Sequence, residues 1–506
     1  MQADAIRLVL ADETETQRLG QDIAMALRTG DVLLLKGDLG AGKSTLARAI
    51  IRTLADDPAL EVPSPTFTLV QTYETRVPVR HFDLYRLSSP DELLELGLEE
   101  ALQEAVVLVE WPERAEGSFP ANAVAIELAH VTADGRDVLE GRIASISGIG
   151  PTFDRIRRSL AIREFLFGAG WADAQRSHLT GDASARSYET AGLPGEPTRI
   201  VMNSPRLVLG PPVRDSKPYA VIAHTAQSVA AFVGVGGALK ANGVVVPAIY
   251  AKDLDNGFLL IEHLGTESFL HDGKPVAERY AAAAELLAFM HAKTWPDEMT
   301  VDGSAVHILP PFDRAAMMIE VELLVDWYVP HASGLPASDV LRQKFSRLWD
   351  DALDRISDTE KSILLRDYHS PNLIWRPELQ GHDRLGVLDF QDAMRGPMAY
   401  DVASLAMDAR ATVSPDIEAS TVAAYCDARQ KSGGFDRAAF DLSYATMAAQ
   451  RNSKILGIFV RLDRRDGKPQ YLKLLPRIRD YLKRALAHPD LAALRGLYIA
   501  EGFIDA

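Results

Sequence analysis

Short apolar runs alternate with amphipathic stretches along the first 150 residues. The run at residues 32–35 enters a glycine-rich turn, and a helical pattern follows over residues 44–54. A second run, at residues 106–109, follows an acidic helical pattern over residues 91–104. Strand–turn–helix alternation is typical of parallel strands covered by helices. The pattern predicts an α/β domain over residues 1–150, which ends where small residues and glycines become frequent.

The pattern changes after this segment. Residues 155–170 predict a helix, and strand-like pieces separated by Gly and Pro follow it. Helical patterns then dominate to the end, interrupted by a strand–loop–strand pattern at residues 363–390. A β-rich lobe before a helical lobe is the order found in the protein-kinase architecture. We therefore predict an α+β, kinase-like domain over residues 151–506, with lobes at about 155–265 and 266–506.

Composition and charge exclude several classes of protein. The 506 residues are 47% hydrophobic and 25% charged, which is ordinary globular usage. The single cysteine, Cys426, excludes an internal disulfide framework and a cysteine-based zinc site. The chain begins without a secretory signal pattern and has no apolar stretch of the ~18 residues that a spanning helix needs. We expect a cytoplasmic protein with no membrane partner.

The negative charge is concentrated in the first 150 residues. They hold 13 Lys and Arg against 25 Asp and Glu, a net charge of −12 out of −16 for the chain. Phosphate contacts in nucleic-acid complexes need Lys and Arg. The first domain is therefore a poor direct binder of nucleic acid.

Residues 37–44, GDLGAGKS, match the P-loop pattern G-x-x-x-x-G-K-[ST]. An apolar run enters this segment and a helical pattern leaves it, which argues against a chance glycine-rich turn. Backbone N–H groups of such a loop surround the phosphates of ATP, the lysine adds a positive charge, and the hydroxyl binds Mg²⁺. The candidate nucleotide-binding residues are Gly37, Asp38, Leu39, Gly40, Ala41, Gly42, Lys43, Ser44 and Thr45, and Ser44 is also a candidate magnesium ligand.

Three further segments surround this loop: VPSPTFTLVQTY, HFDLYRL and VVLVEWPER. With the P-loop, this set resembles the TsaE family, ATPases needed for threonylcarbamoyl modification of adenosine-37 in tRNA. The resemblance covers residues 1–150. It implies that the domain works with the proteins TsaD and TsaB and meets tRNA only indirectly, through that complex.

The TsaE resemblance also implies site residues. Residues 64–66 would form a switch-like segment near the γ-phosphate, Asp83 would support the metal, and Glu110 would position or activate the attacking water, beside Trp111. Alternatively, Asp83 is a cap or turn residue and Trp111 a packing residue, and we expect His81 to be structural. A P-loop kinase is the other hypothesis for this domain, but the segment is too short and too acidic for an arginine-bearing lid.

A second constellation lies in the strand–loop–strand pattern. Asp367 and Asn372 have the spacing D-x-x-x-x-N between apolar runs, and Asp389 ends the next apolar run. In kinases this set supplies the aspartate that accepts the substrate's hydroxyl proton and the asparagine and aspartate that hold Mg²⁺. Each motif alone is weak evidence, but their order after a β-rich lobe favours a kinase over an inert pseudokinase.

Four segments resemble the AmgK branch of the aminoglycoside-phosphotransferase-like family: GDASARSYET, RIVMNSP, LDFQDAMRGPMAYDVASL and ILGIFVRLDRRDGKPQYL. The resemblance covers about residues 155–506. It implies a sugar kinase that uses ATP and Mg²⁺ to phosphorylate the anomeric hydroxyl of N-acetylmuramic acid and N-acetylglucosamine in cell-wall recycling. An aminoglycoside-type kinase and a regulatory, kinase-like partner of the first domain are the alternatives, although about 350 residues suit a small-molecule pocket better than a minimal regulatory kinase.

The chain departs from the common kinase pattern in two places. Leu365 replaces the histidine of the usual His-Arg-Asp triplet, and the strand RIVMN lacks the usual lysine. We expect the segment GDASARSY to bind the nucleotide phosphates instead, through backbone amides and through Ser184 and Arg186. His369, inside the loop, would either contact the substrate or form a hydrogen bond with the backbone. Asp401 would brace the catalytic loop.

Overall fold

A computed structural model describes residues 4–87, 89, 92–133, 136–179 and 186–505 of the chain. The chain divides into two compact units. The first contains Met1–Asn203, Tyr250–Asp253 and Phe258–Leu260, and the second contains the remaining residues. Among the described residues, no helix combines the length and the apolar character needed to cross a membrane.

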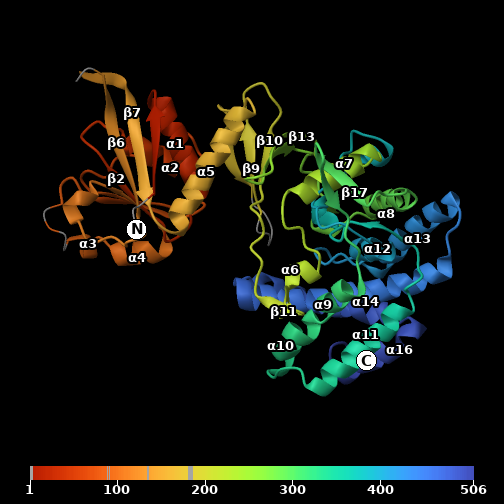
Figure 1. Ribbon diagram of the computed structural model, residues 1–506. Helices are drawn as coiled ribbons and strands as arrows, with labels where there is room; N and C mark the ends of the chain where they lie inside the picture. Colours follow the sequence, from red (N-terminus) through yellow and green to blue (C-terminus); the bar gives the residue numbers. More distant parts are fainter. Residues whose placement is uncertain (1–3, 88, 90–91, 134–135, 180–185, 506) are drawn as a thin grey trace. The chain divides into compact units, whose positions relative to one another are not determined.

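A seven-stranded mixed sheet is the core of the first unit. Its strands are β1 (Asp4–Leu10), β2 (Val32–Lys36), β3 (Val70–Tyr73), β4 (Val79–Asp83), β5 (Val106–Glu110), β6 (Val124–Ala133) and β7 (Arg136–Gly148). Their order in space is β1-β7-β6-β2-β5-β4-β3, and Figure 1 labels β7, β6 and β2 of this sheet. β2 pairs in parallel with β5 and β6, and β5 pairs in parallel with β4. This arrangement confirms the predicted α/β fold.

Helices cover this sheet because its central strands are apolar on both faces. Leu33 and Leu35 pack in the same core cluster as the first two helices, whereas Val32 belongs to a second cluster with Leu98. The acidic stretch predicted as one helix forms two short helices, separated by Gly97 with a φ of 75°. The helical elements are α1 (Glu13–Ala26), α2 (Lys43–Ala55), α3 (Glu92–Glu95), α4 (Leu98–Glu104) and the 3-10 turn η1 (Pro112–Ala115).

A helix and a second sheet continue the chain. Helix α5 (Pro151–Gly168) begins directly after Gly150. The domain boundary predicted near residue 150 therefore falls between β7 and α5. That a domain ends there stays a prediction. The five-stranded sheet has the order β13-β14-β10-β9-β8, and α5 packs on it through Ile162 and Leu166, against Val201 and Phe258. Its strands are β8 (Gln175–Leu179), β9 (Ser187–Gly192), β10 (Arg199–Asn203), β13 (Ile249–Asp253) and β14 (Phe258–Glu262).

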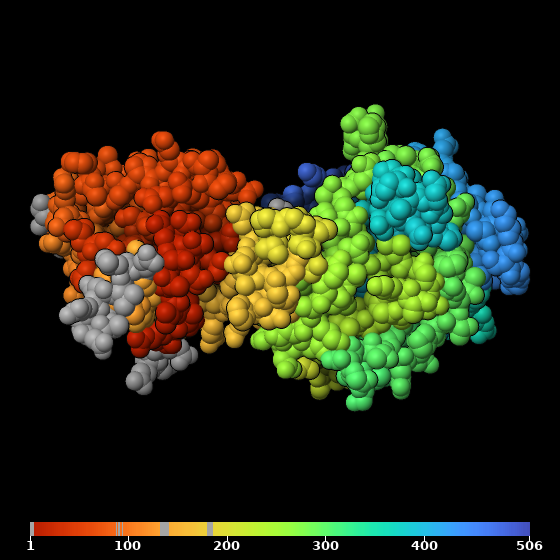
Figure 2. Space-filling model, turned by 90° about the horizontal axis from the view of Figure 1, so that it is seen from above, coloured from red at the N-terminus to blue at the C-terminus, as the bar shows by residue number. Residues whose placement is uncertain are grey.

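Buried ion pairs connect this segment to α1 within the first unit. Asp22 of α1 is 2% exposed and accepts hydrogen bonds from Arg163 at 2.8 Å and from Arg176 at 2.7 Å. Arg176 also pairs with Glu189 at 2.8 Å. Figure 2 shows the yellow segment directly against red and orange atoms of the preceding residues. Because buried charges are costly unless paired, this network requires α5 and β8 to pack on α1.

The second unit is dominated by helices, as the sequence predicts for the larger lobe. The helices are α6 (Tyr219–Ile222), α7 (Ala230–Ala241), α8 (Ala277–His291), α9 (Arg314–Val321), α10 (Val329–Ser333), α11 (Asp339–Asp354), α12 (Ala399–Ala406), α13 (Pro415–Ser432), α14 (Arg437–Asp466), α15 (Leu475–Ala485) and α16 (Ala492–Ala500). Shorter turns of helix are η2 (Leu324–Tyr328), η3 (Ser370–Asn372), η4 (Gly381–Arg384), η5 (Pro469–Leu474) and η6 (Pro489–Leu491).

Small two-stranded sheets lie among these helices. They pair β11 (Pro212–Arg214) with β12 (Lys217–Pro218), β15 (Leu270–His271) with β16 (Lys274–Pro275), β17 (Glu298–Asp302) with β18 (Ala305–Ile308), β19 (Lys361–Leu364) with β22 (Met394–Pro397), and β20 (Leu373–Trp375) with β21 (Leu385–Val387). The last two pairs form the predicted strand–loop–strand segment. They place Asp367, Asn372 and Asp389 in the loops between the strands.

Two candidate nucleotide sites

The P-loop connects β2 to the first turn of α2. Gly37, Gly40 and Gly42 have φ angles of 134°, 79° and 106°, which side-chain-bearing residues rarely adopt. A Cβ at Gly37 would lie 2.3 Å from the carbonyl oxygen of Leu128. The glycines of the motif are therefore required by the backbone path as well as by the approach of a ligand. Thr45 follows in the first turn of α2 and is half-buried.

Lys43 is buried at the start of α2, with 4% of its surface exposed. Its Nζ donates hydrogen bonds to the carbonyl oxygens of Gly37 at 2.6 Å and Asp38 at 2.9 Å, and lies 3.6 Å from the ring centroid of Trp111. Burial lowers the pKa of Lys43, while the negative charge of Glu110 opposes the shift. The ammonium group is thus held by carbonyl dipoles and an indole face, next to the loop that would surround a triphosphate.

The carboxylates predicted for this site meet at one edge of the sheet. The parallel register of β4 and β5 places Asp83 beside Glu110 at the carboxyl ends of both strands. Ser44 Oγ donates to Glu110 Oε2 at 2.9 Å, and Ser64 Oγ donates to Asp83 Oδ2 at 2.9 Å. Both carboxylates are at most 3% exposed. The structure therefore brings together Ser44, Asp83 and Glu110, which are 66 residues apart at the extremes.

His81 belongs to this site as well. Its Nε2 lies 3.0 Å from Glu110 Oε1, and the side chain is 1% exposed. The sequence predicts a structural His81, and the structure places it in contact with the predicted catalytic residue Glu110. Alternation along β4 was the available signal, because His81 and Asp83 are two residues apart and lie on the same face of the strand.

Oxygen atoms of Ser44, Asp83 and Glu110 suit Mg²⁺, which prefers hard oxygen ligands. In the part of the chain that the structure describes, His, Cys, Asp and Glu side chains form no group of three or more that could hold a metal ion by themselves. Mg²⁺ in nucleotide sites is bound by one or two carboxylates together with substrate phosphates. The residues present fit that mode of binding.

The second site is built from the loops that follow β19 and β21. Asn372 Nδ2 donates to the carbonyl oxygen of Asp367 at 2.9 Å and lies 3.4 Å from Asp389 Oδ2. Gln391 Nε2 donates to Asp389 Oδ1 at 2.7 Å. Asp389 has a φ of 54° and Arg366 a φ of 72°, and such strained positions cluster at functional sites. The three predicted residues are therefore brought together, with oxygen atoms that suit Mg²⁺.

Positive charges surround Asp367. Burial opposes its ionisation, but Lys454, His369 and Arg451, in decreasing order of effect, lower its pKa below the usual value. Its side chain is nevertheless 40% exposed, so a substrate can reach the carboxylate. Beneath it, the fully buried Glu320 pairs with Arg366 and, at 2.9 Å, with Lys454 Nζ.

Asp401 holds the backbone of the catalytic loop. It is fully buried in α12 and accepts hydrogen bonds from the N–H groups of Leu365 and Arg366. Burial raises its pKa to about 7, although both N–H groups favour the ionised form. These contacts confirm the bracing expected of Asp401. His369 is also buried, and its Nδ1 has no hydrogen-bond partner among the described residues.

Strand β10 contains the sequence RIVMN, where the usual kinase lysine is missing. Val201 packs in the cluster under α5, and Asn203, two residues on, accepts a hydrogen bond from Arg158 Nε of α5 at 2.8 Å. Asn203 therefore faces the helix. Of the residues expected to replace the lysine, Arg186 precedes β9 and is half-buried, while Ser184 lies outside the described residues.

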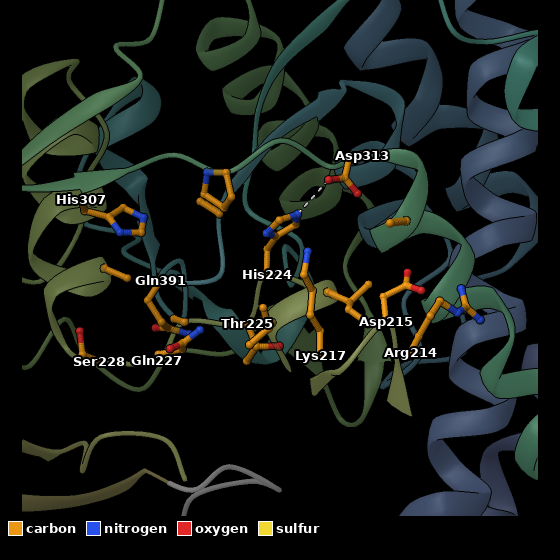
Figure 3. A pocket seen from close by; sticks show the side chains of 17 residues that line it. Arg214, Asp215, Lys217, His224, Thr225, Gln227, Ser228, His307, Asp313 and Gln391 are labelled. Atoms are coloured by element: carbon orange, nitrogen blue, oxygen red, sulfur yellow. Dashed lines mark hydrogen bonds and ion pairs between the residues drawn. The ribbon is translucent and has the colours of Figure 1, made fainter. Parts of the chain in front are cut away.

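A cavity of about 500 Å³ opens beside the second site (Figure 3). Gln391, which donates to Asp389, lines it, and Ala226, another lining residue, donates its N–H to Asp392 Oδ1 at 2.7 Å. His224 Nε2 lies 3.2 Å from Asp313 Oδ2 across the cavity. Sequence reasoning missed this cavity because its walls come from separate segments near residues 214–228, 307–315 and 391–393.

A P-loop at the ends of parallel strands, with buried carboxylates beside it, defines a P-loop ATPase, and an aspartate–asparagine–aspartate set in a kinase-like lobe defines a phosphotransferase. Comparison with known proteins supports both of these classes. Residues 10–138 match the family model "Threonylcarbamoyl adenosine biosynthesis protein TsaE", and residues 179–440 match the model "Phosphotransferase enzyme family". The chain belongs to both families, and both parts are ATP-using enzymes.

Curated relatives match each part. An N-acetylmuramate/N-acetylglucosamine kinase of Caulobacter vibrioides is 35% identical over 353 residues, covering 67% of this chain and 96% of the relative. A tRNA threonylcarbamoyladenosine biosynthesis protein TsaE of Rickettsia felis is 47% identical over 107 residues, covering 21% of this chain and 62% of the relative. The corresponding protein of Rickettsia bellii is 40% identical over 129 residues, covering 25% of this chain and 89% of the relative.

Proposed function

We propose that the chain carries two separate ATP-dependent activities. The first, over residues 1–150, is ATP hydrolysis that supports formation of N6-threonylcarbamoyladenosine-37 in tRNA. The second, over residues 151–506, is phosphorylation of the anomeric hydroxyl of N-acetylmuramate and N-acetylglucosamine in cell-wall recycling. The observation that carries the second assignment is the Asp367–Asn372–Asp389 set beside a sugar-sized cavity, in a chain that spans 96% of a relative with that name.

In the first domain, Lys43 and the loop amides bind the β- and γ-phosphates of ATP. Ser44 and Asp83 are the proposed Mg²⁺ ligands, and the ion supplies neutralising charge to the phosphate oxygens. Glu110 orients the attacking water and His81 holds Glu110 in place, because an anchored carboxylate positions its water better than a mobile one. Arrival of ATP would replace the carbonyl contacts of Lys43 with phosphate contacts.

In the second domain, Asp367 accepts the proton of the sugar hydroxyl. The sugar oxygen forms a bond to the γ-phosphorus, the bond from that phosphorus to ADP breaks, and the proton stays on Asp367. The lowered pKa of Asp367 keeps it ionised at neutral pH, which is the form that can accept this proton, although it also makes Asp367 a weaker base. Asn372 and Asp389 would hold Mg²⁺, and Ser184 and Arg186 would contact the phosphates.

The proposed partners differ between the two domains. The first domain would bind the proteins TsaD and TsaB and reach tRNA only through them, since its net charge of −12 opposes direct binding of nucleic acid. The second would bind a small sugar as its substrate. Both domains would act in the cytoplasm.

The sugar-kinase assignment is tested with the full chain, ATP, Mg²⁺ and a panel of acceptors that includes N-acetylmuramate, N-acetylglucosamine and aminoglycosides. We expect phosphate transfer to the two sugars, and a phosphorus–hydrogen coupling at carbon 1 in the NMR spectrum of the product. Transfer to a 4- or 6-hydroxyl would reject the anomeric assignment, and transfer only to aminoglycosides would reject the sugar assignment.

The ATPase assignment is tested by ATP hydrolysis with and without the TsaD–TsaB pair. The Asp367→Asn variant is used, so that the second site adds no turnover. We expect the pair to stimulate hydrolysis. Unchanged hydrolysis, together with phosphate transfer to a metabolite, would instead identify the domain as a P-loop kinase.

A further inference from the structure

The cavity beside Asp389 is large enough for a small-molecule substrate. Its volume of about 500 Å³ is in the range of small-molecule sites. Gln391 connects it directly to Asp389 through a hydrogen bond of 2.7 Å. A sugar in this cavity would therefore lie next to the residues that handle the transferred phosphate.

Two of the positively charged or titratable groups in the cavity wall are already paired. Arg214 of β11 forms an ion pair with Glu322, and His224 lies 3.2 Å from Asp313. Lys217 of β12 also lines the cavity, and its ammonium group makes no hydrogen bond or ion pair with any described residue. Among the described residues that line the cavity, Lys217 is thus the cation available to a ligand, since burial lowers the pKa of the remaining lining imidazole, His307.

The local backbone directs Lys217 into the cavity. The hairpin between β11 and β12 turns at Asp215 and Ser216, whose φ angles are 48° and 59°. Figure 3 shows the Lys217 side chain rising toward His224, while the carboxylate of Asp215 lies on the Arg214 side. The carboxylate of Asp215 is therefore directed away from the Lys217 ammonium.

N-acetylmuramate and N-acetylglucosamine differ by one group, the lactyl ether of N-acetylmuramate, which ends in a carboxylate. We propose that Lys217 binds this carboxylate and so determines how strongly the enzyme prefers the anionic sugar. The inference rests on the proposed sugar-kinase function. A hydrogen bond between an ammonium and a carboxylate is a strong, charge-assisted contact, and the neutral sugar has no group that could form it.

The chain provides a matched control for this test. Lys217 and Lys274 each begin a two-residue Lys-Pro strand of a small hairpin, and both side chains are exposed. Lys274 does not line the cavity. The same substitution at both positions therefore removes the same charge from the same type of local structure.

The experiment measures kcat/KM for both sugars in the wild-type chain and in the Lys217→Met, Lys217→Arg and Lys274→Met variants. For Lys217→Met we expect the ratio of N-acetylmuramate to N-acetylglucosamine kcat/KM to fall roughly ten- to hundredfold, mainly through KM. Lys217→Arg should keep most of the ratio, because it keeps the charge, and Lys274→Met should leave it unchanged.

Several results would overturn the inference. A Lys217→Met ratio equal to that of the wild type means that the carboxylate is bound elsewhere. An equal loss on both sugars means that Lys217 supports the fold or the whole sugar, and a thermal melt separates these cases. A wild-type chain that phosphorylates neither sugar rejects the proposed function itself, which is distinguishable from a wild type that accepts both with a ratio insensitive to Lys217.

Discussion

The two nucleotide sites of this chain obtain their charged groups in different ways. The P-loop site has its lysine within the motif, where carbonyl groups five and six residues away hold it. The kinase-like site has no lysine in β10, and two of the charges that act on Asp367, Lys454 and Arg451, come from the distant helix α14. Glu320, which holds Arg366 and Lys454, is 46 and 134 residues from them in sequence.

This difference determines whether replacing a charged residue affects only ligand binding or also the stability of the fold. Lys43 is held by backbone carbonyls that any residue type provides, so its replacement breaks no ion pair, although it removes a positive charge near the buried carboxylates of Glu110 and Asp83. In the second site, Glu320 neutralises two buried cations, so its replacement disturbs the fold as well as the site. We therefore expect the P-loop site to tolerate substitution better than the kinase-like site.

The largest effect should come from removing one charged group from each site. Asp367→Asn should lower sugar phosphorylation by about 10²–10⁴-fold, because the proton acceptor is lost, and should leave nucleotide binding by the first site intact. Lys43→Ala should weaken nucleotide binding by the first site and should leave sugar phosphorylation intact. Calorimetry with a non-hydrolysable ATP analogue, alongside both activity assays, separates these outcomes. If Lys43→Ala abolished all nucleotide binding, the interpretation with two sites would be wrong.

The next effect is on stability. Glu320→Ala should lower the free energy of unfolding by about 3–5 kcal/mol, because it leaves Arg366 and Lys454 as unpaired buried cations. The control is Asp326→Ala, which removes the exposed partner of Arg342 and should cost less than about 1 kcal/mol. Urea titrations of both variants provide the measurement. Equal losses in the two variants would contradict the role given to Glu320.

A smaller effect is expected within the first site. His81→Ala should reduce ATP hydrolysis roughly ten- to hundredfold, because a hydrogen bond to the carboxylate of Glu110 is lost. The loss should fall on kcat, with little change in KM, since His81 touches Glu110 and not the P-loop. His81→Gln, which retains a donor, should recover part of the rate. A normal kcat in His81→Ala would mean that His81 has only a structural role.

The last effect concerns pH, and it is the smallest at any single step because it is spread over several pH units. Burial, assisted by the positive charge of Arg429, lowers the pKa of His291 to about 3. Between about pH 6.5 and 3 the unfolded chain therefore binds a proton that the folded chain does not, so stability falls as the pH falls. We expect the wild type to lose up to about 1.4 kcal/mol per pH unit relative to His291→Gln in this range. Parallel slopes for both proteins in urea titrations would reject this assignment.

The amino-acid sequence by itself determined the features that depend on neighbouring residues. The P-loop could be predicted because its glycines, lysine and serine lie within eight positions, and the backbone turn requires those residue types. The strand–loop–strand pattern with Asp367, Asn372 and Asp389 extends over more positions, 367–389, but it is still one continuous segment. Both fold classes followed from the order of apolar runs, since period and order are properties of the chain itself.

Only the tertiary structure decided which side chains support these motifs. His81 joins Glu110 because β4 and β5 pair in parallel, and Glu320 reaches Arg366 because α9 packs near the catalytic loop. The cavity around Lys217 likewise depends on segments that are separated by more than 150 residues. Burial and charge pairing act between distant residues, and a sequence pattern contains no distance. Such contacts therefore had to be observed in the folded chain.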